Sequence, residues 1–211
     1  RNIKIARSYA SETDIYIPKA YGQYYSRKLL VMEFVQGTKF RDLAAESDDN
    51  AERIAKQGLH AAVKQIFEDG FFHADPHPGN LLVTDDMNLC IIDWGMVGRL
   101  TEKDRYELIE LLKAVVDKNS DALVHSLLRL CQTTGKAIQL RDLERELLDI
   151  LDNYYAVPIK DMDIGQLMMS MTRLIHNHQL RLPSDLVIMI KALVTAEGSA
   201  RQVYPELDFV S

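Results

Sequence analysis

Four polar side chains suited to catalysis fall within the segment His73-Ala74-Asp75-Pro76-His77-Pro78-Gly79-Asn80. A further carboxylate, Asp93, follows Asn80 by 13 residues and begins the tripeptide Asp93-Trp94-Gly95. Phosphoryl transfer from a nucleotide needs a carboxylate that accepts the proton of the attacking hydroxyl or water. It also needs amide and carboxylate oxygens that hold Mg²⁺ against the phosphates. The residue types and their spacing therefore predict Asp75 as the proton-accepting carboxylate, with Asn80 and Asp93 as magnesium ligands.

Two other interpretations of the same residues remain open. Aspartate and asparagine are frequent in turns and at helix ends, so these residues could have only a structural role. Imidazole and carboxylate groups also bind zinc or iron, so His73, Asp75, His77 and Asp93 could form the transition-metal site of a hydrolase. That site would leave Asn80 without a role, and the two prolines do not direct the histidines toward one tetrahedral centre.

A predicted β-hairpin positions two of these residues. Residues 81–83 and 89–92 are short apolar segments on either side of a polar turn at Asp85-Asp86. Because the two ends of a hairpin lie side by side, we expect Asn80 and Asp93 at the same end of a small sheet.

The segments before the hairpin predict one helix and two strands. Apolar residues recur every three or four positions over residues 51–67, which indicates a helix. Gly70 suits the left-handed conformation that ends many helices. Further upstream, residues 20–25 and 28–35 predict two antiparallel strands, the second well buried.

From Thr101 onward the hydrophobic pattern is helical. Thr101 and Asp104 have the spacing of a capping box at a helix start. The periodicity predicts helices at residues 106–116, 121–131, 141–155, 164–178 and 184–203. The chain thus combines a strand-containing first part with a helical body, which is an α+β architecture.

Composition limits the classes of function. The 211 residues carry a formal net charge of −6 and no basic block, which argues against nucleic-acid binding through a cationic surface. No apolar stretch approaches the roughly 20 residues of a membrane-spanning helix, so we expect no transmembrane segment in this chain. Cys90 and Cys131 lie in separate apolar segments and are expected to be reduced core residues.

The polar loop and the Asp93-Trp94-Gly95 tripeptide resemble the catalytic-loop and metal-binding motifs of protein-kinase-like folds. With Phe71-Phe72 in front of it, the loop is more similar still to the UbiB/ADCK (AarF-like) family of atypical kinases. Residues 30–37, 95–100 and 182–198 share that similarity, which spans nearly the whole chain. The resemblance implies a kinase-like fold, mainly its helical C-lobe with a small β remnant of the N-lobe. Residues 1–37 would be the end of the N-lobe and the hinge strand, and residues 38–211 the C-lobe.

The resemblance also implies roles for single residues of the loop. Asp75 matches the catalytic aspartate, and Asn80 and Asp93 match the magnesium ligands next to the nucleotide. His77 stands where typical kinases carry a lysine that touches the transferred phosphate. His73 is expected to support the loop and the Asp93 segment.

For the nucleotide, the resemblance implies ATP as the cofactor, bound together with Mg²⁺. Met32 corresponds to the gatekeeper residue beside adenine. The hinge, whose backbone binds adenine, would run from Glu33 to Val35.

Other features of the family are missing from this sequence, among them the phosphate-binding loop, the strand lysine and the Lys-X-Gly-Gln segment. We expect them upstream of Arg1, so this chain by itself should turn over no ATP.

For the intact protein, the resemblance implies a kinase or ATPase that supports isoprenoid quinone (ubiquinone) biosynthesis. Its partners would be an isoprenoid quinone or another lipid and quinone-biosynthesis proteins. Its place would be the cytoplasmic side of a membrane, as a peripheral protein, or the mitochondrial matrix of a eukaryote. The alternatives are a small-molecule kinase of the aminoglycoside or choline type and a non-catalytic pseudokinase scaffold.

Overall fold

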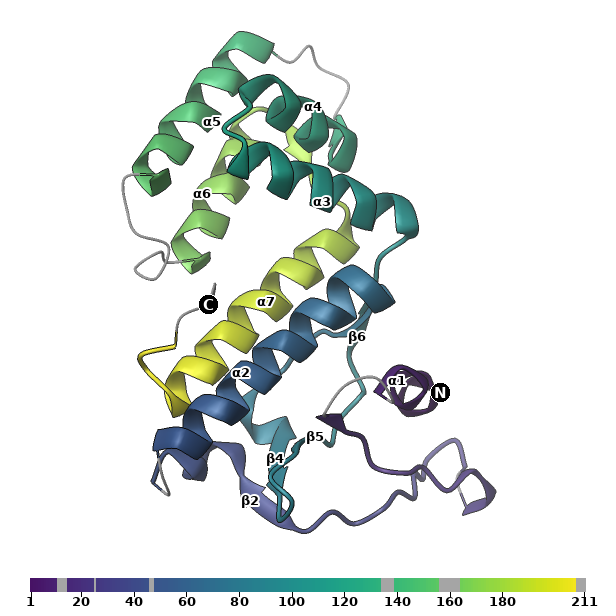
Figure 1. Ribbon diagram of the computed structural model, residues 1–211. Helices are drawn as coiled ribbons and strands as arrows, with labels where there is room; N and C mark the ends of the chain where they lie inside the picture. Colours follow the sequence, from purple (N-terminus) through teal and green to yellow (C-terminus); the bar gives the residue numbers. More distant parts are fainter. Residues whose placement is uncertain (11–14, 25, 46–47, 134–138, 156–163, 208–211) are drawn as a thin grey trace. The chain divides into compact units, whose positions relative to one another are not determined.

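The structure, a computed structural model, describes residues 1–10, 15–24, 26–45, 48–133, 139–155 and 164–207 (Figure 1). The chain divides into two compact units, one formed by Arg1–Arg99 with Lys191–Phe209 and the other by Leu100–Ile190 with Val210–Ser211. The last helix, α7 (Ser184–Val203), contributes residues to both units. Each unit has its own hydrophobic core. The sequence-based boundary at residue 37 concerns the two lobes of a kinase, not these two units, and it stays a prediction.

The first unit contains a four-stranded sheet in the order β1-β5-β4-β2 and a separate two-stranded sheet of β3 and β6. The hairpin expected from the sequence is confirmed, because β4 and β5 pair antiparallel. β2 pairs antiparallel with β4, whereas β1 runs parallel to β5. The strands are β1 (Ile15–Tyr16), β2 (Gly37–Lys39), β3 (Phe71–His73), β4 (Leu81–Thr84), β5 (Leu89–Ile91) and β6 (Val97–Arg99).

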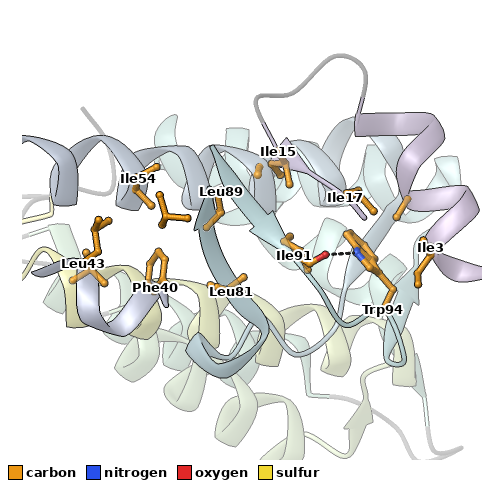
Figure 2. Close-up of a cluster of buried hydrophobic side chains, with 14 of the residues drawn as sticks. Ile3, Ile15, Ile17, Phe40, Leu43, Ile54, Leu81, Leu89, Ile91 and Trp94 are labelled. Carbon is orange, nitrogen blue, oxygen red and sulfur yellow. Dashed lines mark hydrogen bonds between the residues drawn. The ribbon is translucent and has the colours of Figure 1, made fainter. Parts of the chain in front are cut away.

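Apolar side chains of this sheet share one core with α1 (Asn2–Tyr9) and α2 (Asp48–Lys64) (Figure 2). Within it, Ile54 of α2 and Leu89 of β5 are almost completely buried. Trp94 lies in the same core, and its indole N–H donates a hydrogen bond to the carbonyl oxygen of Ile91 (Figure 2). The apolar core thus holds the residue that directly follows Asp93.

The predicted helix before the hairpin ends in an unusual way. α2 passes directly into a π-helical turn, η4 (Gln65–Asp69), which ends at Gly70 in the expected left-handed conformation with φ of 63°. Lys64 and Asp69, at the two ends of this turn, form an ion pair of 2.7 Å between side chains only 7% and 8% exposed. π-Helical turns occur frequently near functional sites.

The predicted strands at residues 20–25 and 28–35 are confirmed only in their pairing. The Tyr21 N–H donates to the Val31 carbonyl and the Glu33 N–H to the Lys19 carbonyl, but the ladder is reduced to isolated bridges. The expected burial is wrong, because three apolar side chains are 57%, 58% and 87% exposed, those of Leu29, Leu30 and Phe34. Apolar residues are buried only where another layer covers them, and the described part of this unit supplies none here. Tyr25 lies outside the described residues.

The second unit is helical, as the periodicity predicted. Its core consists mainly of leucines, of which Leu143 and Leu147 are 0% and 1% exposed. Thr101 and Asp104 form the expected capping box at the start of α3. The elements of the unit, apart from its part of α7, are α3 (Glu102–Val116), α4 (Ser120–Leu130), β7 (Gln132–Thr133), α5 (Leu140–Tyr155), α6 (Ile164–Asn177) and β8 (Leu180–Arg181).

The architecture is therefore α+β, as predicted, and mostly helical. Within the described ranges, no helix combines the length and the apolar character needed to cross a bilayer.

Candidate functional site

His73, at the end of β3, joins three segments of the chain. Its backbone N–H donates to the side-chain oxygen of Gln65 in the π-helical turn, at 2.9 Å. Its Nδ1 accepts the backbone N–H of Asp75 at 3.0 Å, so the ring proton lies on Nε2, which donates to the carbonyl oxygen of Asp93. Burial lowers the pKa of His73, which favours this neutral form. The imidazole thus supports both the loop and the Asp93 segment, as the sequence suggested.

The loop after His73 folds around the backbone carbonyl of Asp75. This oxygen accepts the backbone N–H of His77 at 2.7 Å and the side-chain Nδ2 of Asn80 at 3.4 Å. Because Nδ2 is engaged in this way, the amide of Asn80 offers its oxygen to a ligand. The Asp75 carboxylate is 37% exposed and so accessible to a substrate.

The ring of His77 is exposed and caps the short 3-10 helix η5 (Pro78–Asn80). Its Nδ1 accepts the backbone N–H of Gly79 at 3.1 Å. The contact between His77 and a transferred phosphate stays a prediction.

The hairpin brings Asn80 and Asp93 to one end of the sheet, as predicted. Leu81 pairs with Ile91, and the next residue of the hairpin, Ile92, donates its N–H to the Asn80 carbonyl at 3.0 Å. Asp93 is exposed, and its Oδ1 accepts the backbone N–H of Gly95 at 2.8 Å. The hairpin hydrogen bonds therefore bring the backbone of Asn80 next to the residue that precedes Asp93.

The oxygen ligands offered by Asn80 and Asp93 fit Mg²⁺ better than a transition metal. Mg²⁺ is typically held by one or two protein oxygens together with water and phosphate oxygens, and Asn80 and Asp93 supply such oxygens. Both ring nitrogens of His73 are already hydrogen-bonded, so this histidine is not free to bind zinc. Among the described residues, no cluster of three or more histidine, cysteine or acidic side chains is suited to a metal. The hydrolase alternative thus loses its support.

An open cavity of 830 Å³ lies beside Asp93. The predicted gatekeeper, Met32, lines it together with Asp93, Trp94 and the first residues of the chain. The neighbouring hinge residues, Glu33 and Val35, do not belong to its lining. The cavity therefore connects one predicted adenine-binding residue with one predicted magnesium ligand.

Glu33, which sequence analysis expected to act through its backbone, has a structural use for its side chain. One carboxylate oxygen accepts the hydroxyl of Tyr16 at 2.6 Å, and the other accepts the backbone N–H of Lys19 at 2.9 Å. These two hydrogen bonds, that of Tyr16 first, lower the pKa of Glu33. The carboxylate thus fixes the start of the predicted hinge.

The backbone around Asp93 is held from several sides. The indole of Trp94 stacks on Phe71 and meets His73 edge-on, with ring centroids 6.4 and 5.2 Å away. The side chain of Asn2, in α1, donates to the Trp94 carbonyl at 2.9 Å. These contacts fix the segment from which Asp93 projects.

Sequence reasoning missed the residues by which α7 contacts the loop. The ammonium group of Lys191 lies 3.7 Å from Oδ1 of Asp75, and the hydroxyl of Ser199 donates to the Pro76 carbonyl at 2.9 Å. Lys191 lies within the segment 182–198 that shares the family similarity, and Ser199 directly follows it, but nothing in the sequence indicates their contacts with the loop. Gln65 was missed as well, because nothing in the sequence indicates that its side chain accepts the backbone N–H of His73.

Comparison with known proteins gives two family matches. The model of the ABC1 atypical kinase-like domain matches residues 1–127, and that of the UbiB helical domain matches residues 147–208. The candidate loop and Asp93 lie in the first match, whereas Lys191 and Ser199 lie in the second.

Individual relatives agree with these matches. The chain is 30% identical over 210 residues to an uncharacterized protein of Synechocystis, covering 99% of this chain and 31% of that protein. It is also 30% identical over 214 residues to the probable protein kinase UbiB of Azotobacter vinelandii, covering 97% of this chain and 39% of the relative. The chain thus spans about a third of the length of the curated relatives it matches.

A solved structure shows the same fold. The structure described as the complex of Rv3197 with erythromycin from Mycobacterium tuberculosis superposes with a TM-score of 0.66 at 20% identity. The match covers 96% of this chain and 52% of the other. At this identity the likeness concerns the fold alone, which is kinase-like, as the sequence predicted.

Proposed function

The chain belongs to the ABC1 atypical kinase-like family, and from that premise we propose that it carries the catalytic and metal-binding half of a site for Mg²⁺-dependent phosphoryl transfer from ATP. The observation that carries this proposal is the hydrogen-bonded arrangement of the loop. Asn80 contacts the Asp75 carbonyl, and His73 joins the Asp75 N–H to the Asp93 carbonyl.

Each residue then has a distinct task. Asp75 orients the attacking hydroxyl or water and accepts its proton. Asn80 and Asp93 would hold Mg²⁺, which when bound neutralises charge on the phosphate oxygens. Met32 would border the adenine in the cavity that also reaches Asp93, with Glu33 and Val35 as the hinge.

The acceptor could be water, a protein or a small molecule, and we propose that the activity supports isoprenoid quinone biosynthesis. Support for this extension comes from the UbiB name of the relatives and from the match of the UbiB helical domain. The same match disfavours a small-molecule kinase of the aminoglycoside or choline type. A quinone or another lipid as a partner, and a peripheral place at a membrane, belong to the same proposal.

The proposal can be tested with Asp93→Asn in the intact protein. This substitution removes the negative charge but retains an oxygen for the Gly95 N–H. We expect Mg·ATP at about 100 times its Kd to stabilise the wild type by about 2.7 kcal/mol, and this stabilisation to be lost in Asp93→Asn. Thermal or urea unfolding with and without Mg·ATP measures it.

Asp86→Asn is the matched control, because Asp86 is an exposed carboxylate in the turn of the same hairpin. It should respond to Mg·ATP like the wild type. A wild-type protein that shows no response to Mg·ATP would contradict the proposed function. Binding without turnover would instead favour a pseudokinase scaffold.

A further inference from the structure

The last helix brings a full positive charge to the candidate catalytic carboxylate. Nζ of Lys191 lies 3.7 Å from Oδ1 of Asp75, and both side chains are accessible, at 58% and 37% exposure. The lysine is therefore free to move toward a substrate without unfolding any part of the unit.

The position of Lys191 is fixed by a second contact of α7 with the same loop. Eight residues along the helix, which is about two turns, the buried hydroxyl of Ser199 donates to the Pro76 carbonyl at 2.9 Å. Ala192 and Ala196, on the same side of the helix as Ser199, are buried as well. The hydrogen bond of Ser199 thus ties α7 to the loop, which keeps the base of the Lys191 side chain near Asp75.

The two histidines of the loop form hydrogen bonds within the loop and its neighbouring segments. His73 is buried, with both ring nitrogens bonded to the backbone of Asp75 and Asp93. His77 uses Nδ1 to cap η5, and this bond leaves Nε2 for the predicted phosphate contact. Lys191 is the cation that the structure places within 4 Å of the Asp75 carboxylate in the described part of the chain.

We infer that Lys191 is a catalytic residue of the proposed reaction, and that its ammonium group binds the phosphoryl group as it is transferred at Asp75. This inference rests on the proposed function. In that reaction the acceptor oxygen bonds to the γ-phosphorus while the bond from that phosphorus to the bridging oxygen of ADP breaks. The bond's electrons leave with ADP, and the acceptor's proton passes to Asp75. Negative charge gathers on the transferred oxygens, where a nearby ammonium group stabilises it.

Substitution of Lys191 in the intact protein tests this role. We expect Lys191→Met to lower kcat for ATP turnover about 100-fold while the KM for Mg·ATP changes less than about threefold. Lys191→Arg should retain more activity than Lys191→Met, because it keeps the charge but not the shape of the donor.

Chemical restoration separates the charge from a structural effect. Lys191→Cys should be as impaired as Lys191→Met, and alkylation with 2-bromoethylamine, which rebuilds an ammonium side chain, should restore at least a tenth of the wild-type kcat. The two thiols of this chain are poor competitors, because burial raises the pKa of Cys90 to about 12 and that of Cys131 to about 11. The controls are the alkylated wild type and the variant Lys103→Cys, which replaces an exposed lysine of α3. Both should keep their activity.

A binding measurement gives a readout independent of turnover. Mg·ADP with aluminium fluoride imitates the phosphoryl group in transfer, and the wild type should bind it more tightly than Mg·ADP alone. In Lys191→Met this preference should fall about tenfold or more, with Mg·ADP affinity unchanged.

The outcomes distinguish the inference from its premise. A wild type that neither binds nor turns over Mg·ATP refutes the proposed function. A wild type that turns over ATP, with Lys191→Met equally active, refutes the role of Lys191 alone. Loss of activity in Lys191→Cys that alkylation does not restore also overturns it, because the effect would then be structural.

Discussion

Some side-chain hydrogen bonds of the two units differ in how far apart in the sequence their partners lie. In the second unit, Arg129 donates to Glu107 and to Ser126, and these partners lie within 22 residues of one another. In the first unit, Ser199 and Asn2 bind backbone carbonyls that are 123 and 92 residues away in the sequence. These contacts of the second unit thus join two consecutive helices, whereas those of the first unit fix the backbone of distant segments next to the candidate site.

This difference suggests that the second unit contributes mainly to folding stability, whereas the first unit fixes the positions of the site residues. Leucine packing tolerates adjustment, so its loss should reduce the free energy of unfolding without a specific effect on chemistry. Hydrogen bonds to the backbone of the loop should matter less for stability and more for the placement of Asp75, Asn80 and Asp93. Substitutions at Leu143, at His73 and at a matched pair of serines, from the largest expected loss of stability to the smallest, test that division.

Leu143→Ala should have the largest effect. Leu143 is completely buried in the core of the second unit, and its truncation should lower the free energy of unfolding by about 3 kcal/mol. Urea unfolding measures this change. Exposed Leu140, at the start of the same helix, provides the control, and Leu140→Ala should change stability by less than about 0.5 kcal/mol. Equal losses in both variants would contradict the assigned core.

His73→Phe should lower the free energy of unfolding by a smaller amount, and this amount should depend on pH. Phenylalanine keeps a ring in place yet leaves the Asp75 N–H and the Asp93 carbonyl without their partner, which should destabilise the protein by about 2 kcal/mol near pH 8.

The pKa of His73 is lowered in the folded state, so below about pH 6.5 the unfolded wild type binds a proton that the native protein excludes. Wild-type stability should then fall with decreasing pH, by up to about 1.4 kcal/mol per pH unit, until the native pKa is reached. The variant lacks this contribution, so the difference between the two proteins should shrink below pH 6.5. Urea unfolding at several pH values measures it, and a constant difference would show that His73 is not held neutral.

Ser199→Ala and Ser126→Ala form a matched pair with the smallest effect. Both serines are buried, at 4% and 1% exposure, and each loss of a hydroxyl should lower stability by about 1 kcal/mol. Only Ser199→Ala should also reduce ATP turnover of the intact protein, because only Ser199 binds the loop. An equal loss of turnover in both variants would remove the distinction between the units.

Local patterns in the sequence were sufficient for much of this structure. The helices of the second unit follow from apolar periodicity, and the capping box at Thr101 from a spacing of three residues. The closeness of Asn80 and Asp93 follows from a hairpin of only 12 residues. These features depend on interactions between near neighbours, which a sequence displays directly.

Other features depend on distant contacts and could not be derived in this way. Nothing near Lys191 or Ser199 in the sequence indicates a partner in the loop. Residues 29–34 are apolar enough to suggest a buried strand, but their burial depends on a covering layer, which composition does not reveal. The π-helical turn at Gln65 likewise fits the same periodicity as an ordinary helix end.

The contact between α7 and the loop has a consequence for biosynthesis. A ribosome makes Pro76 long before Ser199, and at 5–20 residues per second the intervening 123 residues take roughly 6 to 25 s. Throughout that interval the nascent loop lacks the helix that carries its lysine and its serine. A chain whose translation stops before residue 191 would therefore leave the ribosome with Asn80 and Asp93, the proposed magnesium ligands, but without Lys191 and Ser199.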